Sequence, residues 1–265
     1  ITPDSFYNKS KINNIKIFKN QIKNMEKLGV DIIDIGAEST KPGSNAISIE
    51  DENNRLKFYF KELEDIKSNT IISLDTKNQE TMKKSLKYGI SILNDVSGFS
   101  SKKAQEILIQ NKVCGVIMHM QNQPKNMQQD PTYLFPPIDI FDFFEKKINH
   151  LSSLGIKASQ MIVDPGFGFG KSLYHNITLL NYLPIFHSLG VPIAVGLSRK
   201  SLIEEISIKK FKKNKYNFFS PEKRLGGSIA FALKAYDNGV QIIRTHDPLE
   251  TLQSIFCMEE VDINY

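Results

Sequence analysis

The sequence contains few cysteines, and the two that it has stand far apart. Cys114 and Cys257 belong to no recognisable motif, so this 265-residue chain shows neither a disulfide framework nor zinc-ligand spacing. Cys114 lies in an apolar strand segment, where we expect a buried thiol. No apolar run approaches the roughly 20 residues needed to cross a bilayer, and no charged-then-apolar signal segment opens the chain. We therefore expect a cytoplasmic protein with no membrane partner.

Groups for covalent catalysis are also missing from the sequence. No Ser–His–Asp or Cys–His pair occurs at a recognisable spacing, so a covalent nucleophile is not indicated. Magnesium carried in by phosphate groups stays open as a cofactor.

The composition is that of a globular protein with a sizeable core: 40% of residues are hydrophobic and 24% are charged. The net charge is +5, and much of this excess lies in the lysine-rich stretch 209–215. Such a stretch fits a nucleic-acid patch or a solvated loop insertion. The loop is favoured, so we expect no nucleic-acid partner.

Short β-branched segments alternate with amphipathic helical segments along the chain, which predicts right-handed βαβ units and a buried parallel sheet. The predicted strands are 31–35, 70–74, 91–94, 113–119, 160–164, 192–196 and 241–244. The predicted helices lie near 14–28, 51–67, 78–88, 102–111, 139–154, 174–188, 221–238 and 249–258. Five glycines just before strands are expected in left-handed helix caps: Gly29, Gly89, Gly155, Gly190 and Gly239.

We favour an α/β fold of the (β/α)₈ barrel type over an open doubly wound sheet, although the open sheet would need no eighth strand. No linker or change of composition divides the chain, so we expect one domain over residues 1–265. A barrel needs eight strands, and seven are predicted. Because the segment 1–6 resembles a loop that follows a strand, we expect the first strand to be lacking, as in an N-terminally truncated chain.

The most informative segment is I-V-D-P-G-F-G-F-G-K at 162–171. A short strand ends in Asp164, and alternate glycines then form a loop whose backbone can approach a flat ligand. The segment superficially resembles a phosphate-binding G-x-x-x-x-G-K-[ST] loop. Pro165 stands where that motif requires glycine, so we reject a nucleoside-triphosphatase.

Nearly every predicted strand is followed by, or ends in, a polar residue, and in a barrel these residues gather at the C-terminal mouth. Asp75, Asn94 and Asp164 suit a heterocycle with N–H donors, because a carboxylate accepts two parallel hydrogen bonds. The cations Lys200, Arg244 and His246 suit a phosphate group. Phe169 and Arg244 are expected to sandwich the heterocycle.

The chain resembles the dihydropteroate synthase family from end to end. The motifs that it shares, in the family's order, are T-P-D-S-F (2–6), D-I-I-D-I-G-A-E-S-T-K-P-G (31–43), S-L-D-T (73–76), N-D-V-S-G-F (94–99), M-H-M-Q (118–121), D-P-G-F-G-F-G-K (164–171), G-L-S-R-K-S (196–201), G-G-S-I-A (226–230) and R-T-H-D (244–247). This resemblance implies a barrel that joins a pterin diphosphate to 4-aminobenzoate and releases diphosphate. It also implies a homodimer and magnesium bound mainly through the substrate diphosphate.

The resemblance also implies roles for individual residues. Lys200, Arg244 and His246 would be catalytic. The other substrate-binding residues would be Asp34, Thr40, Lys41, Pro42, Asp75, Asn94, Met118, Asp164, Phe169, Gly196 and Ser198. No residue of the chain is expected to ligate the metal, because the family's asparagine ligand would precede Ile1.

The sequence departs from the family pattern at three positions: Lys41 replaces arginine, Asn8 replaces an acidic residue, and Asn122 replaces glycine. Two other interpretations therefore stay open. One is a related pterin-binding barrel that transfers a methyl group, and the other is an inactive remnant of the synthase.

Overall fold

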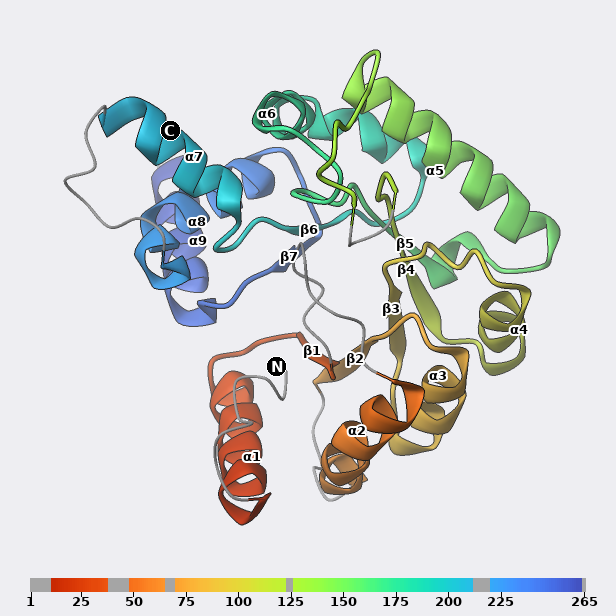
Figure 1. The fold of residues 1–265 in the computed structure, drawn as a ribbon. Coiled ribbons are helices and arrows are strands. Elements are labelled where there is room, and N and C mark those ends of the chain that lie inside the picture. Colours follow the sequence, from red (N-terminus) through yellow and green to blue (C-terminus); the bar gives the residue numbers. More distant parts are fainter. Residues whose placement is uncertain (1–10, 38–47, 65–69, 123–125, 212–219, 264–265) are drawn as a thin grey trace. The chain divides into compact units, whose positions relative to one another are not determined.

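A computed structural model describes residues 11–37, 48–64, 70–122, 126–211 and 220–263. In this part of the chain, strands alternate with helices (Figure 1). The strands are β1 Ile32–Gly36, β2 Ile71–Asp75, β3 Ile92–Asp95, β4 Cys114–Met118, β5 Met161–Asp164, β6 Ala194–Gly196 and β7 Ile242–Arg244. The helices are α1 Lys11–Lys27, α2 Ile49–Glu64, α3 Gln79–Ser85, α4 Lys102–Asn111, α5 Pro136–Ser153, α6 Leu173–Asn181, α7 Ser201–Phe211, α8 Leu225–Asp237 and α9 Pro248–Ile263.

The strands pair in the order in which they occur along the chain. Strands β1 to β5 form one sheet in the order β1-β2-β3-β4-β5, and β6 pairs with β7. The pairs β1–β2, β2–β3, β3–β4 and β6–β7 are parallel, and a parallel bridge joins Val163 to Ile193. Sequential parallel pairing with a helix after each strand is the topology of a (β/α)₈ barrel.

The chain divides into two compact units. Unit 1 comprises residues 1–118, 124–126 and 146–162, and unit 2 comprises residues 119–123, 127–145 and 163–265. Strands β1 to β4 belong to unit 1, and β6 and β7 belong to unit 2. A single domain over 1–265 stays a prediction.

Close packing in unit 1 fixes the position of the strands. Leu74 and Leu93 are fully buried, and so is Phe99 in the loop after β3. A Cβ atom at Gly115 would lie 2.8 Å from the Phe99 ring and 3.0 Å from Leu108. Glycine is therefore required at this position of β4, because a larger residue would displace the aromatic core.

The five predicted left-handed glycine caps are confirmed. Gly29, Gly89, Gly155, Gly190 and Gly239 have φ angles from 69° to 90°, a region that residues with a Cβ atom rarely adopt. All seven predicted strands are present, with boundaries that shift by one or two residues. The β-branched segments therefore located the sheet correctly.

Three expectations were wrong. Helix α7 was not predicted, and its last turn includes Lys209 and Lys210, which were assigned to a loop insertion. The helix predicted near 174–188 is broken: α6 ends at Asn181 and a 3₁₀ segment follows, with Pro184 in its first turn. Proline lacks the N–H that a continuous α-helix needs there. Cys114 is half-buried, not buried, and its thiol lies 3.7 Å from the carbonyl of Ser159.

Candidate functional site

In unit 1, four predicted site residues lie on one face of the sheet. Asp34 pairs with Ser73, two residues before Asp75, and Asp75 pairs with Asn94. Asn94 in turn pairs with Val116, two residues before Met118. Since alternate residues of a strand point to the same face, Asp34, Asp75, Asn94 and Met118 share one face of the sheet. Asp34 lies inside β1 and does not end it, which corrects the expected strand boundary.

A buried carboxylate fixes the chain that follows Asp75. Glu52 of α2 is 5% exposed. It accepts hydrogen bonds from the Thr76 hydroxyl at 2.6 Å, the Asn78 side-chain amide at 2.8 Å and the Thr81 hydroxyl at 2.9 Å. Buried charges are stable only when they are paired or hydrogen-bonded, and three donors satisfy Glu52. The loop that begins directly after Asp75 is thereby held in one conformation.

A second buried carboxylate, that of Asp95, fixes the chain that follows Asn94. Asp95 accepts hydrogen bonds from the Ser97 amide and hydroxyl, both at 2.8 Å, and from the Phe99 amide at 3.1 Å. Burial raises the pKa of Asp95, whereas these bonds and the charge of Lys147 lower it. The Asp95 turn fixes the backbone next to Asn94.

In unit 2, the loop that follows β5 has an unusual backbone conformation. Gly166, Gly168 and Gly170 have φ angles of 69°, 77° and 59°. A Cβ atom at Gly170 would lie 2.6 Å from the Gln121 carbonyl oxygen, so only glycine fits there. At the start of the loop, the Gly166 amide donates a 2.8 Å hydrogen bond to the Asp164 carboxylate. This bond orients Asp164 at the end of β5.

The side chains of Lys200 and Phe169 meet beside this loop. The Lys200 ammonium lies 4.2 Å from the centre of the Phe169 ring, within cation–π distance. The Lys200 side chain also crosses Gly168, where a Cβ atom would lie 3.3 Å from its Cδ. The structure therefore brings together two predicted site residues from the loops after β5 and β6.

The pKa of Asp164 is shifted by several opposing effects. Loss of hydration raises the pKa of its carboxyl group, while the Gly166 amide and the charges of Lys200, Lys171 and Arg244 act in the opposite direction. Three cations therefore act on one carboxylate. Perturbed ionisable groups of this kind are concentrated at functional sites.

The predicted residues at the ends of β6 and β7 also lie together. Gly196 pairs with Arg244 in the β6–β7 register. Ser198 is 8% exposed, and its Oγ lies 3.0 Å from Nδ1 of His246. The pKa of His246 is lowered to about 4 by desolvation and by Arg244 and Arg199, with Asp247 opposing. This lowered pKa favours a neutral His246 at pH 7, whereas the sequence predicted a cation.

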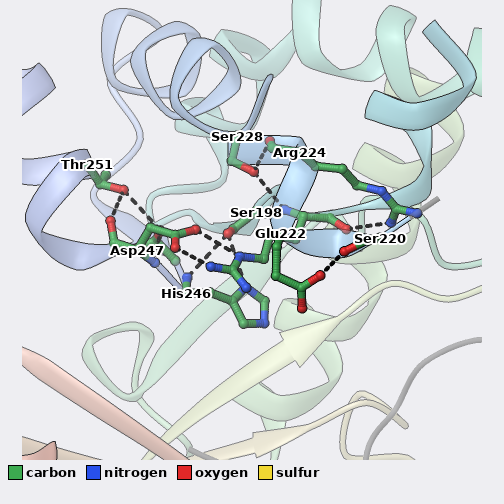
Figure 2. A network of polar contacts seen from close by, with 10 residues as sticks. Ser198, Ser220, Glu222, Arg224, Ser228, His246, Asp247 and Thr251 are labelled. Carbon is green, nitrogen blue, oxygen red and sulfur yellow. Dashed lines mark hydrogen bonds and ion pairs between the residues drawn. The ribbon is translucent and has the colours of Figure 1, made fainter. Parts of the chain in front are cut away.

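Figure 2 shows the network of polar contacts that includes Ser198 and His246. Arg199, which has a φ of 58°, forms a two-point ion pair with Asp247. Its backbone amide donates a 2.8 Å hydrogen bond to Ser228, and its carbonyl accepts one of 2.8 Å from Arg224. The residue between Ser198 and Lys200 is thus fixed by both its side chain and its backbone. The sequence placed Arg199 and Asp247 in shared motifs but gave neither a role.

Three predicted residues, Thr40, Lys41 and Pro42, lie outside the described residues, as does Asn8. Within the described ranges, no group of three or more His, Cys, Asp or Glu side chains could hold a metal ion. The same ranges contain no helix that is long and apolar enough to cross a membrane. Asn122 has a φ of 65°, a conformation for which glycine is the usual choice.

A fold of sequential parallel strands, with ionisable residues at the strand ends, defines a barrel enzyme. The family of pterin binding enzymes matches residues 1–246, and the chain belongs to this family. Its relatives include dihydropteroate synthases. The protein of Escherichia coli K12 is 35% identical over 259 residues, covering 98% of this chain and 88% of the relative. That of Neisseria meningitidis serogroup C is 35% identical over 268 residues, covering 100% and 91%.

Solved structures agree with these relatives. The Yersinia pestis dihydropteroate synthase in a sulfonamide complex is 33% identical, with a TM-score of 0.84 over 96% of this chain and 88% of that one. The Xanthomonas albilineans enzyme with 4-aminobenzoic acid is 31% identical, with a TM-score of 0.84 over 99% and 90%. The comparisons confirm the predicted barrel fold, the predicted family and the predicted transferase function. They favour a synthase over a methyl-transferring barrel.

Proposed function

We propose that this protein joins 6-hydroxymethyl-7,8-dihydropterin diphosphate to 4-aminobenzoate, giving 7,8-dihydropteroate and diphosphate. The observation that carries the proposal is the carboxylate of Asp164 at the end of β5, whose pKa is raised by burial and lowered by the charges of Lys200 and Arg244. A relative's structure contains 4-aminobenzoic acid, and another contains 7,8-dihydropteroate. These are the second substrate and the product of the proposed reaction.

In the proposed complex, the amino-pyrimidine edge of the pterin donates hydrogen bonds to carboxylates. Asp164 would accept two parallel bonds. The family resemblance implies that Asp75 and Asn94 also bind the pterin. Lys200 would lie at the carbonyl side of the ring, and Phe169 and Ser198 would line the aminobenzoate site together with Pro42. A pocket built for these polar contacts rejects rings that lack the matching groups, because a charge is then left unpaired.

The reaction would begin with cleavage of the C–O bond to the diphosphate, whose oxygen takes the electron pair. The pterin cation that remains is attacked by the amine of 4-aminobenzoate, which forms the new C–N bond and loses one proton. Arg244 and His246 would stabilise the departing diphosphate, Arg244 as a cation and His246 as a neutral hydrogen-bonding group. Stabilisation of a leaving anion by preorganised groups is a large catalytic effect and needs no strong base.

Other parts of the proposal come from the family resemblance. Thr40 and Lys41 would contact the diphosphate, Asp34 would lie beneath the loops, and Met118 would be a further substrate-binding residue. Magnesium would reach the site bound to diphosphate oxygens. Among the described residues, no group of three or more His, Cys, Asp or Glu side chains could hold the ion. A cytoplasmic homodimer is part of the proposal.

The test is a product assay with the complete natural chain. Dihydropteroate should form when both substrates are present, with one diphosphate released for each product molecule. Reactions that lack 4-aminobenzoate supply the control. A chain that forms no product and binds no pterin diphosphate would contradict the proposal, and would favour the inactive remnant.

A further inference from the structure

Lys171 is a buried cation to which the proposed reaction assigns no role. It closes the segment 162–171, yet its side chain is only 3% exposed. Its ammonium lies 2.9 Å from the Gly166 carbonyl oxygen, 3.0 Å from that of Phe169 and 3.1 Å from Nδ1 of His119. A longer contact of 3.4 Å reaches the carbonyl of His119 itself. The side chain therefore folds back beneath the loop that precedes it.

The number of close acceptors matches the chemistry of an ammonium group. Lys171 has three N–H donors and no acceptor, and three acceptors lie at about 3 Å. Burial and the charge of Lys171 lower the pKa of His119, so this imidazole is neutral and can accept at Nδ1. An unpaired buried charge is very costly, so the ammonium and the loop carbonyls fix one another.

Other side chains secure the same loop. The Gln128 amide donates to the Gly168 carbonyl at 2.7 Å, and the Tyr133 hydroxyl donates to that of Gly170 at 2.8 Å. The Asn176 side chain accepts from the Gly168 amide at 2.8 Å. Lys171 differs from these residues because it binds two loop carbonyls and also the His119 ring after β4. It is the charged centre of this set of contacts.

We propose that Lys171 is a positioning residue, whose buried ammonium fixes the 166–170 loop so that Asp164 and Phe169 are correctly placed for the pterin. The inference rests on the proposed function. The Gly166 amide, which orients the Asp164 carboxylate, belongs to the residue whose carbonyl Lys171 binds. Phe169, whose ring lies under Lys200, offers its carbonyl to the same ammonium. The Lys171 side chain therefore holds the 166–170 loop near both of its ends.

Lys171 also acts on Asp164 through its charge. Its positive charge lowers the pKa of Asp164, as do Lys200 and Arg244. The neutral His119 also faces this region, and its backbone amide donates to the Asp164 carbonyl at 2.9 Å. Burial lowers the pKa of Lys171 to about 7, with Lys200 adding to the decrease and Asp164 opposing it. Below pH 7 Lys171 is mainly charged, so its removal would favour protonation of Asp164 in the acid range.

The test compares Lys171→Met with the exposed control Lys103→Met in the full chain, by calorimetric titration. The Kd for 6-hydroxymethyl-7,8-dihydropterin diphosphate should rise at least about tenfold in Lys171→Met, since hydrogen bonds that hold a charged group are lost. The Kd for inorganic diphosphate should change less than about twofold, because Arg244 at the end of β7 and His246 just after it belong to a different segment from the 166–170 loop. The acid limit of pterin binding should move to higher pH. Lys103→Met should match the unaltered protein.

Equal loss of both ligands, or pterin binding unchanged in affinity and in pH dependence, would overturn the inference. If Lys171→Met does not fold, Tyr133→Phe provides the second variant, because it removes one loop contact and leaves no buried charge. It should weaken pterin binding by about two- to tenfold and leave diphosphate binding unchanged. Unchanged pterin binding in this variant would then contradict the role assigned to the loop. A failure of the proposed function is distinguishable, because the unaltered protein would itself bind no pterin diphosphate.

Discussion

The ammonium of Lys200 lies 4.2 Å from the centre of the Phe169 ring. The two residues belong to loops that follow different strands, and the sequence assigned both to the substrate site. The contact places a cation at the face of an aromatic ring while its stem crosses Gly168. The position of Lys200 therefore depends on the shape of the glycine loop.

Replacement of the Phe169 ring should disturb Lys200. Phe169→Leu removes the cation–π contact, which contributes about 0.5–2 kcal/mol, and we expect pterin diphosphate affinity to fall by roughly two- to tenfold. Phe169→Tyr keeps an aromatic face and should remain within about twofold of the unaltered protein. Calorimetric titration measures both. Equal affinities for the leucine and tyrosine variants would show that the ring face is unimportant.

Arg199 and Asp247 should be energetically coupled. Their side chains are 26% and 10% exposed and form a two-point contact. A double-mutant cycle with Arg199→Met and Asp247→Asn should give a coupling energy of about 1–3 kcal/mol in denaturant unfolding. The exposed pair Lys234 and Asp237 is the control, with an expected coupling below about 0.5 kcal/mol. Similar values for the two pairs would contradict the account of this network.

Two neighbouring glycines of α8 should respond in opposite directions to alanine. A Cβ atom at Gly227 would lie 2.3 Å from Ile203 of α7, whereas one at Gly226 would meet nothing within 4 Å. Gly227→Ala should lower the free energy of unfolding by about 1–3 kcal/mol through overpacking. Gly226→Ala should raise it by up to about 1 kcal/mol, because alanine favours the helix. Two variants of equal stability would refute this packing of α7 against α8.

Pterin binding should depend on the ionisation of Asp164. The pKa of this carboxyl group is raised above its usual value, chiefly by desolvation. Because the pterin N–H groups need an ionised acceptor, affinity should fall as the pH decreases through the raised pKa. The midpoint should lie above the value of about 4 typical of aspartate. Titration at several pH values checks this, and Asp164→Asn should lack the transition. A midpoint at or below 4 would contradict the direction of the shift.

Local patterns were sufficient to predict the sheet and its glycine caps. Strands such as β2 and β4 are buried segments that contain β-branched residues. Gly89 and Gly190 have positive φ angles and end the helical segments that precede strands. Helix α7 was missed because its buried side is narrow, since Leu202 and Ile203 are its only buried residues, and because its last turn contains Lys209 and Lys210. A helix with many lysines and few buried residues lacks the apolar periodicity by which a helix is predicted from sequence.

The sequence correctly predicted that Asp75 and Asp164 lie at the ends of strands, whereas their roles in substrate binding stay predictions. Residues that act through other residues were not predictable in this way. Lys171 appeared to be a terminal cation of a loop, and only the fold brings it to His119, 52 positions earlier in the chain. Glu52 likewise reaches Thr76 from a different element. Such roles depend on contacts between distant parts of the chain, which residue spacing does not encode.

The carboxylate of Asp164 at the end of β5 is expected to bind the pterin ring. The most direct test of this expectation is the Kd of 6-hydroxymethyl-7,8-dihydropterin diphosphate for Asp164→Asn, measured by calorimetry beside the unaltered protein. The amide keeps the shape of the side chain but loses the charged acceptor, so affinity should fall by about 1.5–3 kcal/mol, roughly 10- to 100-fold. Equal affinity of the two proteins would contradict the account.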